Sequence, residues 1–113
     1  MQHAPRVTVC PATTIDAPIE VVWPLVTDPH SVGDWADVRF EAAEPDGPVH
    51  IGQRWHFSTT ALGRRWPVTM TVTNVSADCQ SLALDVALPL GIRNEEHMTL
   101  ARLADGRTRV QFG

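Results

Sequence analysis

The 113-residue sequence has no lysine, no tyrosine and only two cysteines. Its nine basic side chains are all arginine, and thirteen acidic residues bring the formal net charge to −4 at pH 7. An acidic chain lacks the basic surface with which proteins attract nucleic acid, so we expect no nucleic-acid partner. Cys10 and Cys79 lie far apart in the sequence and form no motif, which favours two buried thiols and leaves a disulfide between them open.

Long hydrophobic runs are also missing. No window approaches the ~20 apolar residues that a membrane-spanning helix needs, so we expect no membrane span. Met1 is followed by polar residues rather than by a basic start and an apolar run, which argues against an ordinary secretory signal and for a cytoplasmic location. The length suits a single domain over residues 1–113, and the 43% hydrophobic content is enough for one modest core.

Motifs for metal, nucleotide or nucleophilic chemistry are missing as well. The five histidines show no metal-ligand spacing, the cysteines form no Cys-x-x-Cys pair, and there is no glycine-rich phosphate loop. No serine stands in a nucleophile-elbow sequence. We therefore expect no metal and no other cofactor.

The stretch "VVWPLVTDPHSVGDW" (residues 21–35) begins as an amphipathic helix and is interrupted by Pro24. A proline and Glu20 in the first turn predict a helix over about residues 18–26. Pro24 removes one backbone hydrogen bond, but it lies near the end of this helix, where a kink is tolerated. A second piece of one or two turns is expected over residues 29–34, with a bend between the two helices.

Alternation of apolar and polar residues predicts strands in the rest of the chain. Pro67 lies on the polar side of the clearest alternating segment, which favours an edge position or a bulge near the turn. One strand, two short helices and about six antiparallel strands joined by tight turns make an α+β fold. The expected strands are residues 6–15, 38–44, 53–60, 65–75, 81–91, 92–103 and 107–113.

The segment "TTIDAPIEVVWPLVTDPHSVGDW" (residues 13–35) resembles the opening of the START-like helix-grip superfamily, SRPBCC. The likeness consists of Ile-x-Ala-Pro leading into a helix, then Val-Trp, Asp-Pro and a tryptophan after the second helix. "IGQRWHF", "VTNVSADCQSLAL" and "LADGRTRVQF" match the later strands of that superfamily. The resemblance spans nearly the whole chain and is strongest to the bacterial polyketide cyclase/dehydrase and lipid-transport branch. It implies a curved antiparallel sheet of about six to seven strands that encloses a ligand cavity.

Two features depart from that family's pattern. A residue other than proline usually follows the tryptophan of the first helix, so Pro24 implies a sharper bend. The family also ends in a long C-terminal helix that the sheet grips, whereas this sequence stops at Gly113, where the last strand would end. We therefore expect a C-terminally truncated domain, or an open sheet face covered by a second copy in a homodimer, by a swapped element or by solvent. An uncovered apolar face of this kind would be an interaction surface.

The period-2 pattern predicts a largely apolar inward face for the sheet. These side chains either line a cavity for an apolar or aromatic ligand or fill the core, and the family resemblance favours the cavity. Trp23 and Trp35 flank the bent helices and would line the mouth of the cavity or fix the helices to the sheet. The residues expected to bind ligand are Trp23, Trp35, Trp55, Phe57, Trp66, Met70, Leu84, Val86 and Met98.

Few polar side chains share the inward parity. If Met98 faces inward, so do Asn94 and Glu96. A carboxyl group among apolar walls could act as an acid or base, because burial disfavours its charged form; the alternative is that Glu96 lies near an open end of the sheet and is solvated. Arg102 has the inward parity but lies close to a turn, and the other strand arginines point outward (Arg54, Arg65 and Arg93). Glu96 and Arg102 are the two catalytic candidates, and the lack of a central inward arginine counts against cyclisation, since cyclases that this sequence resembles often use one.

These features favour a binding module that holds a small hydrophobic molecule, such as a lipid, a polyketide or another aromatic metabolite. The first alternative is an enzyme, a polyketide cyclase/dehydratase or aromatase that confines a polyketone chain, with Glu96 or Arg102 handling a proton or a charge. The second alternative is a protein-interaction module whose apolar sheet face docks a partner. Whether the protein is an enzyme stays open at this level.

Overall fold

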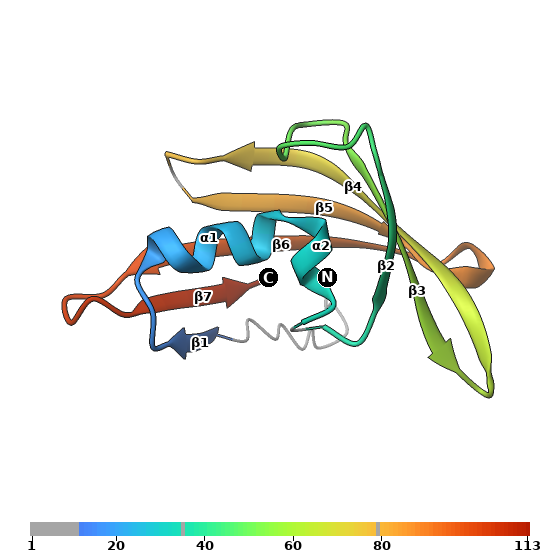
Figure 1. Ribbon diagram of the computed structural model, residues 1–113, viewed down its shortest axis with the longest axis horizontal. Helices are drawn as coiled ribbons and strands as arrows, with labels where there is room; N and C mark the ends of the chain where they lie inside the picture. Colours follow the sequence, from blue (N-terminus) through green and yellow to red (C-terminus); the bar gives the residue numbers. More distant parts are fainter. Residues whose placement is uncertain (1–11, 35, 79) are drawn as a thin grey trace, which may run out of the picture.

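The computed structural model describes residues 12–34, 36–78 and 80–113, and it shows one antiparallel sheet with two short helices on one face (Figure 1). The strand order across the seven-stranded sheet is β1-β7-β6-β5-β4-β3-β2. The arrangement confirms the α+β fold expected from the sequence. In chain order the elements are β1 (Ala12–Ile15), α1 (Ile19–Thr27), α2 (Pro29–Val32), β2 (Arg39–Glu44), β3 (Arg54–Ala61), β4 (Arg64–Ser76), β5 (Ser81–Ala87), the 3₁₀ turn η1 (Pro89–Gly91), β6 (Arg93–Arg102) and β7 (Thr108–Phe112).

The sheet is strongly curved. Irregularities between Phe40 and Ala42 in β2 and between Val72 and Asn74 in β4 shift the register of pairing. Extra residues of this kind bend a strand and increase its twist. In Figure 1, β2 and β3 cross the direction of β6 and β7 at a steep angle, so the sheet curls around the face that carries α1 and α2.

The bend between the helices is made by Asp28 rather than by Pro24. Helix α1 continues past Pro24 to its end at Thr27. The Pro24 carbonyl accepts a hydrogen bond from the Asp28 amide at 3.0 Å, and the Thr27 hydroxyl donates to the Trp23 carbonyl at 2.8 Å. Asp28 then adopts an extended backbone, and its carboxylate accepts from the His30 amide at 3.0 Å, which caps α2.

One expected strand is longer than the strand observed, and another is described only in part. The expectation that the strand beginning at residue 81 runs to Gly91 is wrong, because β5 ends at Ala87 and a 3₁₀ turn follows. Pro89 has no amide hydrogen for a ladder, and Leu90 and Gly91 take positive φ values of 67° and 74°. Of the expected first strand, residues 12–15 form β1, and residues 6–11 lie outside the described part of the chain.

The β3–β4 hairpin extends beyond the neighbouring strand β5. Pairing between β4 and β5 begins at Thr69, which lies opposite Ala87, whereas the residues of β4 before it pair with β3 alone. Pro67 therefore lies where β4 has no second neighbour, which confirms its predicted edge position. This overhang forms the long arm at one end of the sheet in Figure 1.

The hydrophobic core lies between the helices and the inward face of the sheet. The helices contribute Ile19, Val22, Val26 and Val32, all nearly inaccessible to solvent. Full burial of such a side chain stabilises the fold by about 1.5–3 kcal/mol. The strands contribute Trp55, Phe57, Val68, Val72, Leu82, Leu84, Val86, Met98, Leu100 and Val110. Within the described residues, β7 is the last element, and no helix is long and apolar enough to cross a membrane.

Candidate functional site

A cavity of about 270 Å³ lies between the two helices and the inward face of the sheet. Helix α1 contributes Val26 to its wall, α2 contributes Val32, and Ala36 follows α2. The strands supply most of the remaining wall with large apolar side chains. These are Trp55, Met70, Leu82, Leu84, Val86, Leu88, Met98 and Phe112, with Asn94, Glu96 and His97 completing the lining.

The alternation of β5 and β6 puts the apolar residues on this wall. Leu82 lies opposite Met98, and Leu84 lies opposite Glu96 in the ladder between the two strands. Side chains that face each other in this way lie on the same side of a sheet. A one-residue slip would turn the whole set outward, so the buried face fixes the register.

Trp55 is held in the cavity wall by Gln53, a fully buried polar residue immediately before β3. The Trp55 indole N–H donates to the Gln53 side-chain oxygen at 2.9 Å. The amide nitrogen of Gln53 in turn donates to the carbonyls of Pro45 and Gly47, at 2.9 and 3.1 Å. One side chain thus orients the indole and fastens the loop between β2 and β3, which leaves the indole's polar atom satisfied.

Aromatic rings continue from Trp55 to the second helix. The rings of Trp55 and Phe57 meet edge to face with centroids 6.4 Å apart, and Phe57 meets Phe40 at 6.0 Å in a similar way. Phe40 packs against His30 of α2, with centroids 4.3 Å apart. Such pairs favour one relative orientation, so this row fixes α2 to β2 and β3 on one side of the cavity.

The polar part of the lining consists of Asn94, Glu96 and His97, all on β6. The Asn94 side-chain amide donates to a Glu96 carboxylate oxygen at 2.6 Å. Glu96 is half-buried and Asn94 is exposed, so these residues mark the place where the cavity meets solvent. Glu96 lies on the inward face of the sheet, as its parity predicted. Its partial exposure agrees with the alternative that this carboxyl group lies near an open end of the sheet and contacts solvent.

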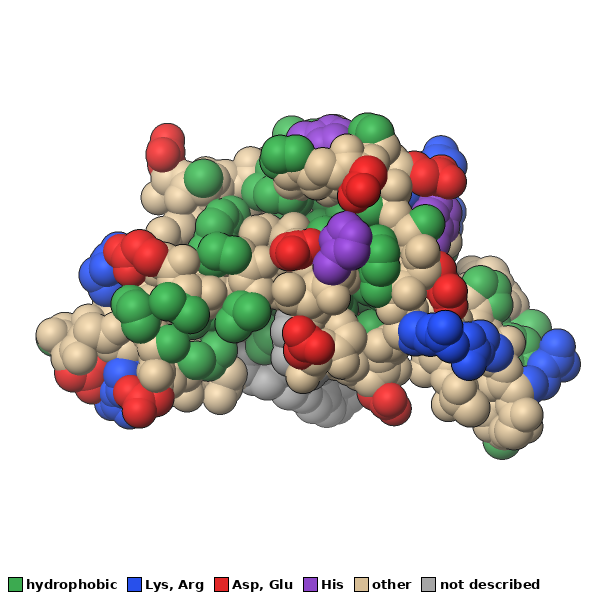
Figure 2. All heavy atoms as spheres, viewed as in Figure 1, with side chains coloured by type: hydrophobic (Ala, Val, Ile, Leu, Met, Phe, Trp, Pro, Cys, Tyr) green, Lys and Arg blue, Asp and Glu red, His purple; other side chains and the backbone are tan. Residues whose placement is uncertain are grey.

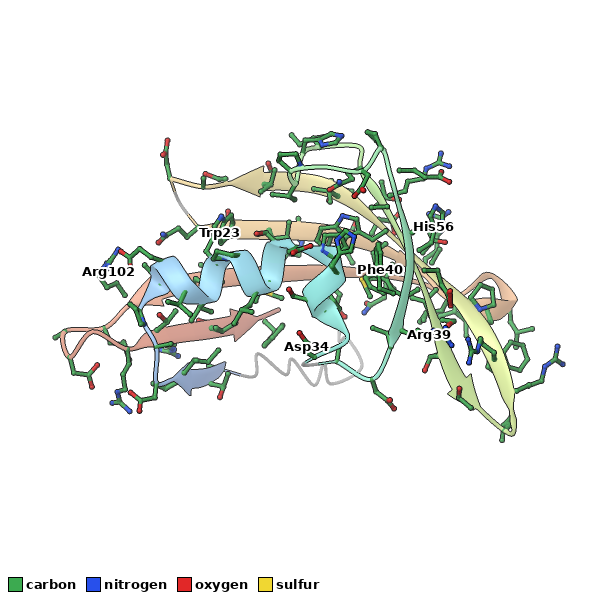
Figure 3. The ribbon with its side chains drawn as sticks, viewed as in Figure 1. Trp23, Asp34, Arg39, Phe40, His56 and Arg102 are labelled. Atoms are coloured by element: carbon green, nitrogen blue, oxygen red, sulfur yellow. The ribbon has the colours of Figure 1, made fainter. Side chains whose placement is uncertain are left out.

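Four of the residues expected to bind ligand lie elsewhere or are not described. Trp23 packs against the core as a half-buried side chain and does not line the cavity; Figure 3 shows it on the side of α1 toward β5. Phe57 is buried beside Trp55 and does not line the cavity. Trp66 lies on the overhanging hairpin, where its indole N–H donates to the Ala61 carbonyl at 3.0 Å. Trp35 lies outside the described residues, as do both cysteines.

Arg102 faces α1 rather than the cavity. Its guanidinium donates to the Glu20 carboxylate at 2.6 Å, at the start of the helix (Figure 3). This hydrogen bond from Arg102 is the main cause that lowers the pKa of Glu20 below its ordinary value. The pair joins the first turn of α1 to the end of β6 and places Arg102 away from Glu96, so the two catalytic candidates do not meet in one site.

A larger hollow of about 470 Å³ lies on the surface between the junction of α1 and α2 and the loop after β2. Its lining includes exposed prolines and the polar residues Asp28, His30 and Asp46. We assign the candidate site to the smaller cavity, because its wall is made of buried apolar side chains. In the described part of the chain, no group of three histidine, cysteine or acidic side chains could hold a metal ion.

The sequence model of the polyketide cyclase/dehydrase and lipid-transport family matches residues 6–113. The chain belongs to this family. No curated protein sequence matches it.

Solved structures confirm the helix-grip, SRPBCC-type fold of this family member at low sequence identity. A Staphylococcus aureus protein of unknown function, SA2116, superimposes with a TM-score of 0.72 at 12% identity, covering 92% of this chain and 65% of the other. Ara h 8.0201 superimposes with a TM-score of 0.70 at 11% identity, covering 92% and 72%. DynU16, from the dynemicin biosynthetic locus, gives 0.63 at 23% identity, covering 93% and 36%. The chain therefore spans less than two thirds of the length of the first and last of these proteins.

The cavity of this family member also includes residues that sequence reasoning did not select. Val26 and Val32 were visible only as apolar positions of short helices, and Phe112 as one alternating residue of the last strand. Ala36 carries no sequence signal, since a small residue in a turn has many uses. Their common place in the wall depends on how the helices lie against the sheet, which no local pattern specifies.

Proposed function

We propose that this protein binds a small hydrophobic or aromatic molecule in the cavity between α1, α2 and the sheet. The observation that carries the proposal is a largely apolar hollow of about 270 Å³ beside a core of buried side chains. Protein interiors leave few voids larger than a water molecule. The volume of this hollow is roughly nine times the ~30 Å³ that a water molecule occupies in the liquid. The hollow is therefore large enough to hold a small ligand.

The size of the cavity limits the part of a ligand that it can enclose. At the packing density of protein interiors, about 0.75, a hollow of 270 Å³ holds roughly 200 Å³ of ligand atoms. That volume suits a bicyclic or tricyclic aromatic molecule or a short acyl chain. The family's association with polyketides and lipids, and the occurrence of DynU16 in a biosynthetic locus, support ligands of these classes.

Fluorescence of the neutral probe N-phenyl-1-naphthylamine tests the proposal. We expect saturable enhancement of probe emission, together with energy transfer from tryptophan, because Trp55 lines the cavity. Val86→Trp places a large ring in the hollow and should weaken binding by about tenfold or more. Ala83→Val, on the opposite face of the same strand, is the matched control and should bind as the wild type does. Absence of saturable binding, or equal binding by Val86→Trp in a folded protein, would refute the proposal.

A second candidate function is supported by Glu96. A carboxylate at the mouth of an apolar cavity could move a proton during cyclisation or dehydration of a confined polyketone. A tetraketide thioester incubated with the protein would then give cyclised product faster than the buffer control. Glu96→Gln should lower turnover while the affinity for the probe is kept. Equal rates of product formation with and without protein would refute the enzymatic function.

A further inference from the structure

The polar groups of the cavity are confined to one strand. In the ladder between β5 and β6, Glu96 lies opposite Leu84 and Asn94 lies opposite Val86. Both apolar partners line the cavity, so both polar side chains lie on the same face of the sheet. They belong to the first half of β6, next to the turn η1, and no other side chain of the lining is an acid or an arginine. The ligand site therefore has a long apolar part and one negatively charged end.

The carboxylate at this end keeps capacity for further hydrogen bonds. One oxygen of Glu96 accepts from Asn94 at 2.6 Å. Of the ion pairs formed by the described residues, none involves Glu96: the arginines of these pairs contact Glu41, Asp85, Glu20 and Asp105. A carboxylate accepts about four hydrogen bonds. A ligand that reaches the second oxygen thus meets an acceptor that no arginine of the described residues engages in an ion pair.

We propose that Glu96, oriented by Asn94, makes the cavity selective for ligands with a hydrogen-bond donor or a positive charge at one end of an apolar body. This inference rests on the proposed function. A phenol, an alcohol or an amine donates to the carboxylate in a charge-assisted bond, while the rest of the molecule fills the apolar part. A fatty acid or an aromatic acid brings a second negative charge to the half-buried end and is rejected. The expected ligands are neutral or cationic, and acidic lipids are not expected to bind.

Three compounds with the same ring system test the inference: 2-naphthol, 2-naphthylmethylamine and 2-naphthoate. Their dissociation constants are measured by calorimetry near neutral pH with wild-type protein, Glu96→Gln and Glu95→Gln. Glu95 lies next to Glu96 on the outward face, opposite Asp85, so the control variant removes the same charge at a site that faces away from the cavity. The three compounds differ in the group that would meet Glu96 and share the apolar part.

With wild-type protein, naphthol and the amine should bind about tenfold or more tightly than naphthoate, as expected for a like charge placed beside a carboxylate. Glu96→Gln should reduce this ratio to within about threefold, chiefly by improving naphthoate binding, whereas Glu95→Gln should leave it unchanged. Equal binding of naphthol and naphthoate by the wild type overturns the inference and leaves the proposed function standing. An equal effect of both variants also overturns the inference, because the net charge of the protein, and not Glu96, would then determine the preference for naphthol over naphthoate. Binding of none of the three compounds overturns the inference, and if N-phenyl-1-naphthylamine also fails to bind, the proposed function is overturned with it.

Discussion

Replacement of Gln53 by leucine should destabilise the protein and loosen the loop after β2. Gln53 is fully buried, and its side chain makes three hydrogen bonds, one with the Trp55 indole and two with loop carbonyls. Leucine has a similar size and can make none of them. The substitution therefore separates the polar contribution of this side chain from its packing.

The magnitude follows from the surroundings of each lost bond. The Trp55 indole N–H has no access to water, because Trp55 is 0% exposed, and a buried donor without a partner costs about 1–3 kcal/mol. The carbonyls of Pro45 and Gly47 belong to exposed residues and regain water, so each of these bonds costs about 1 kcal/mol or less. The added apolar surface of leucine offsets about 1 kcal/mol. We expect a net loss of about 2 kcal/mol in the free energy of unfolding.

Urea unfolding followed by far-ultraviolet circular dichroism measures this loss without depending on tryptophan emission. Trp55→Phe and the double variant complete a cycle, in which removal of both partners should cost less than the sum of the single changes by about 1 kcal/mol. Gln111→Leu, the same substitution at an exposed position of β7, is the matched control and should change stability by less than about 0.5 kcal/mol. A Gln53→Leu variant as stable as the control, or additive single changes, would show that the network does not hold the cavity wall.

Two further predictions concern the surface. Hydrogen bonding from Arg102 lowers the pKa of Glu20 in the folded protein below its ordinary value of 4.5, so the ionised carboxylate stabilises the fold above that pH and loses this effect as the pH falls through the folded-state value. Glu20→Gln should therefore lower the urea midpoint slightly at neutral pH, and the difference from wild type should shrink in acid and in high salt; a difference that grows in acid would contradict the assignment. Leu62 is 94% exposed with φ of 53° at the tip of the β3–β4 hairpin, beside Gly63 with φ of 73°, a conformation that asparagine adopts with less strain. Leu62→Asn should raise the free energy of unfolding by about 0.5–1 kcal/mol, whereas Leu62→Ala keeps the left-handed strain and should gain nothing; equal stability of the two variants would argue against strain at the tip.

Sequence patterns predicted the side of the sheet on which residues lie better than their position along it. Trp66 and Trp55 belong to neighbouring strands and both share the inward parity, yet only Trp55 reaches the cavity. The difference arises because β4 extends past β5 and carries Trp66 onto the overhang. Arg102 likewise has the expected parity but lies at the end of β6, where it meets α1. Parity is a property of one strand, whereas the extent of its overlap with neighbours is set by long-range pairing.

The chain by itself determined the order of its elements, the apolar face of each strand and the family, because these follow from local periodicity and from motifs in sequence. Packing of the helices against the curved sheet decided that a hollow remains, that Gln53 holds Trp55 in the wall, and that Glu96 lies at the opening outside any ion pair of the described residues. Each of these depends on residues brought together from distant segments, such as Val26, Met98 and Phe112. Distances between such segments depend on strand register and helix placement, which hydrophobic alternation along the chain does not encode.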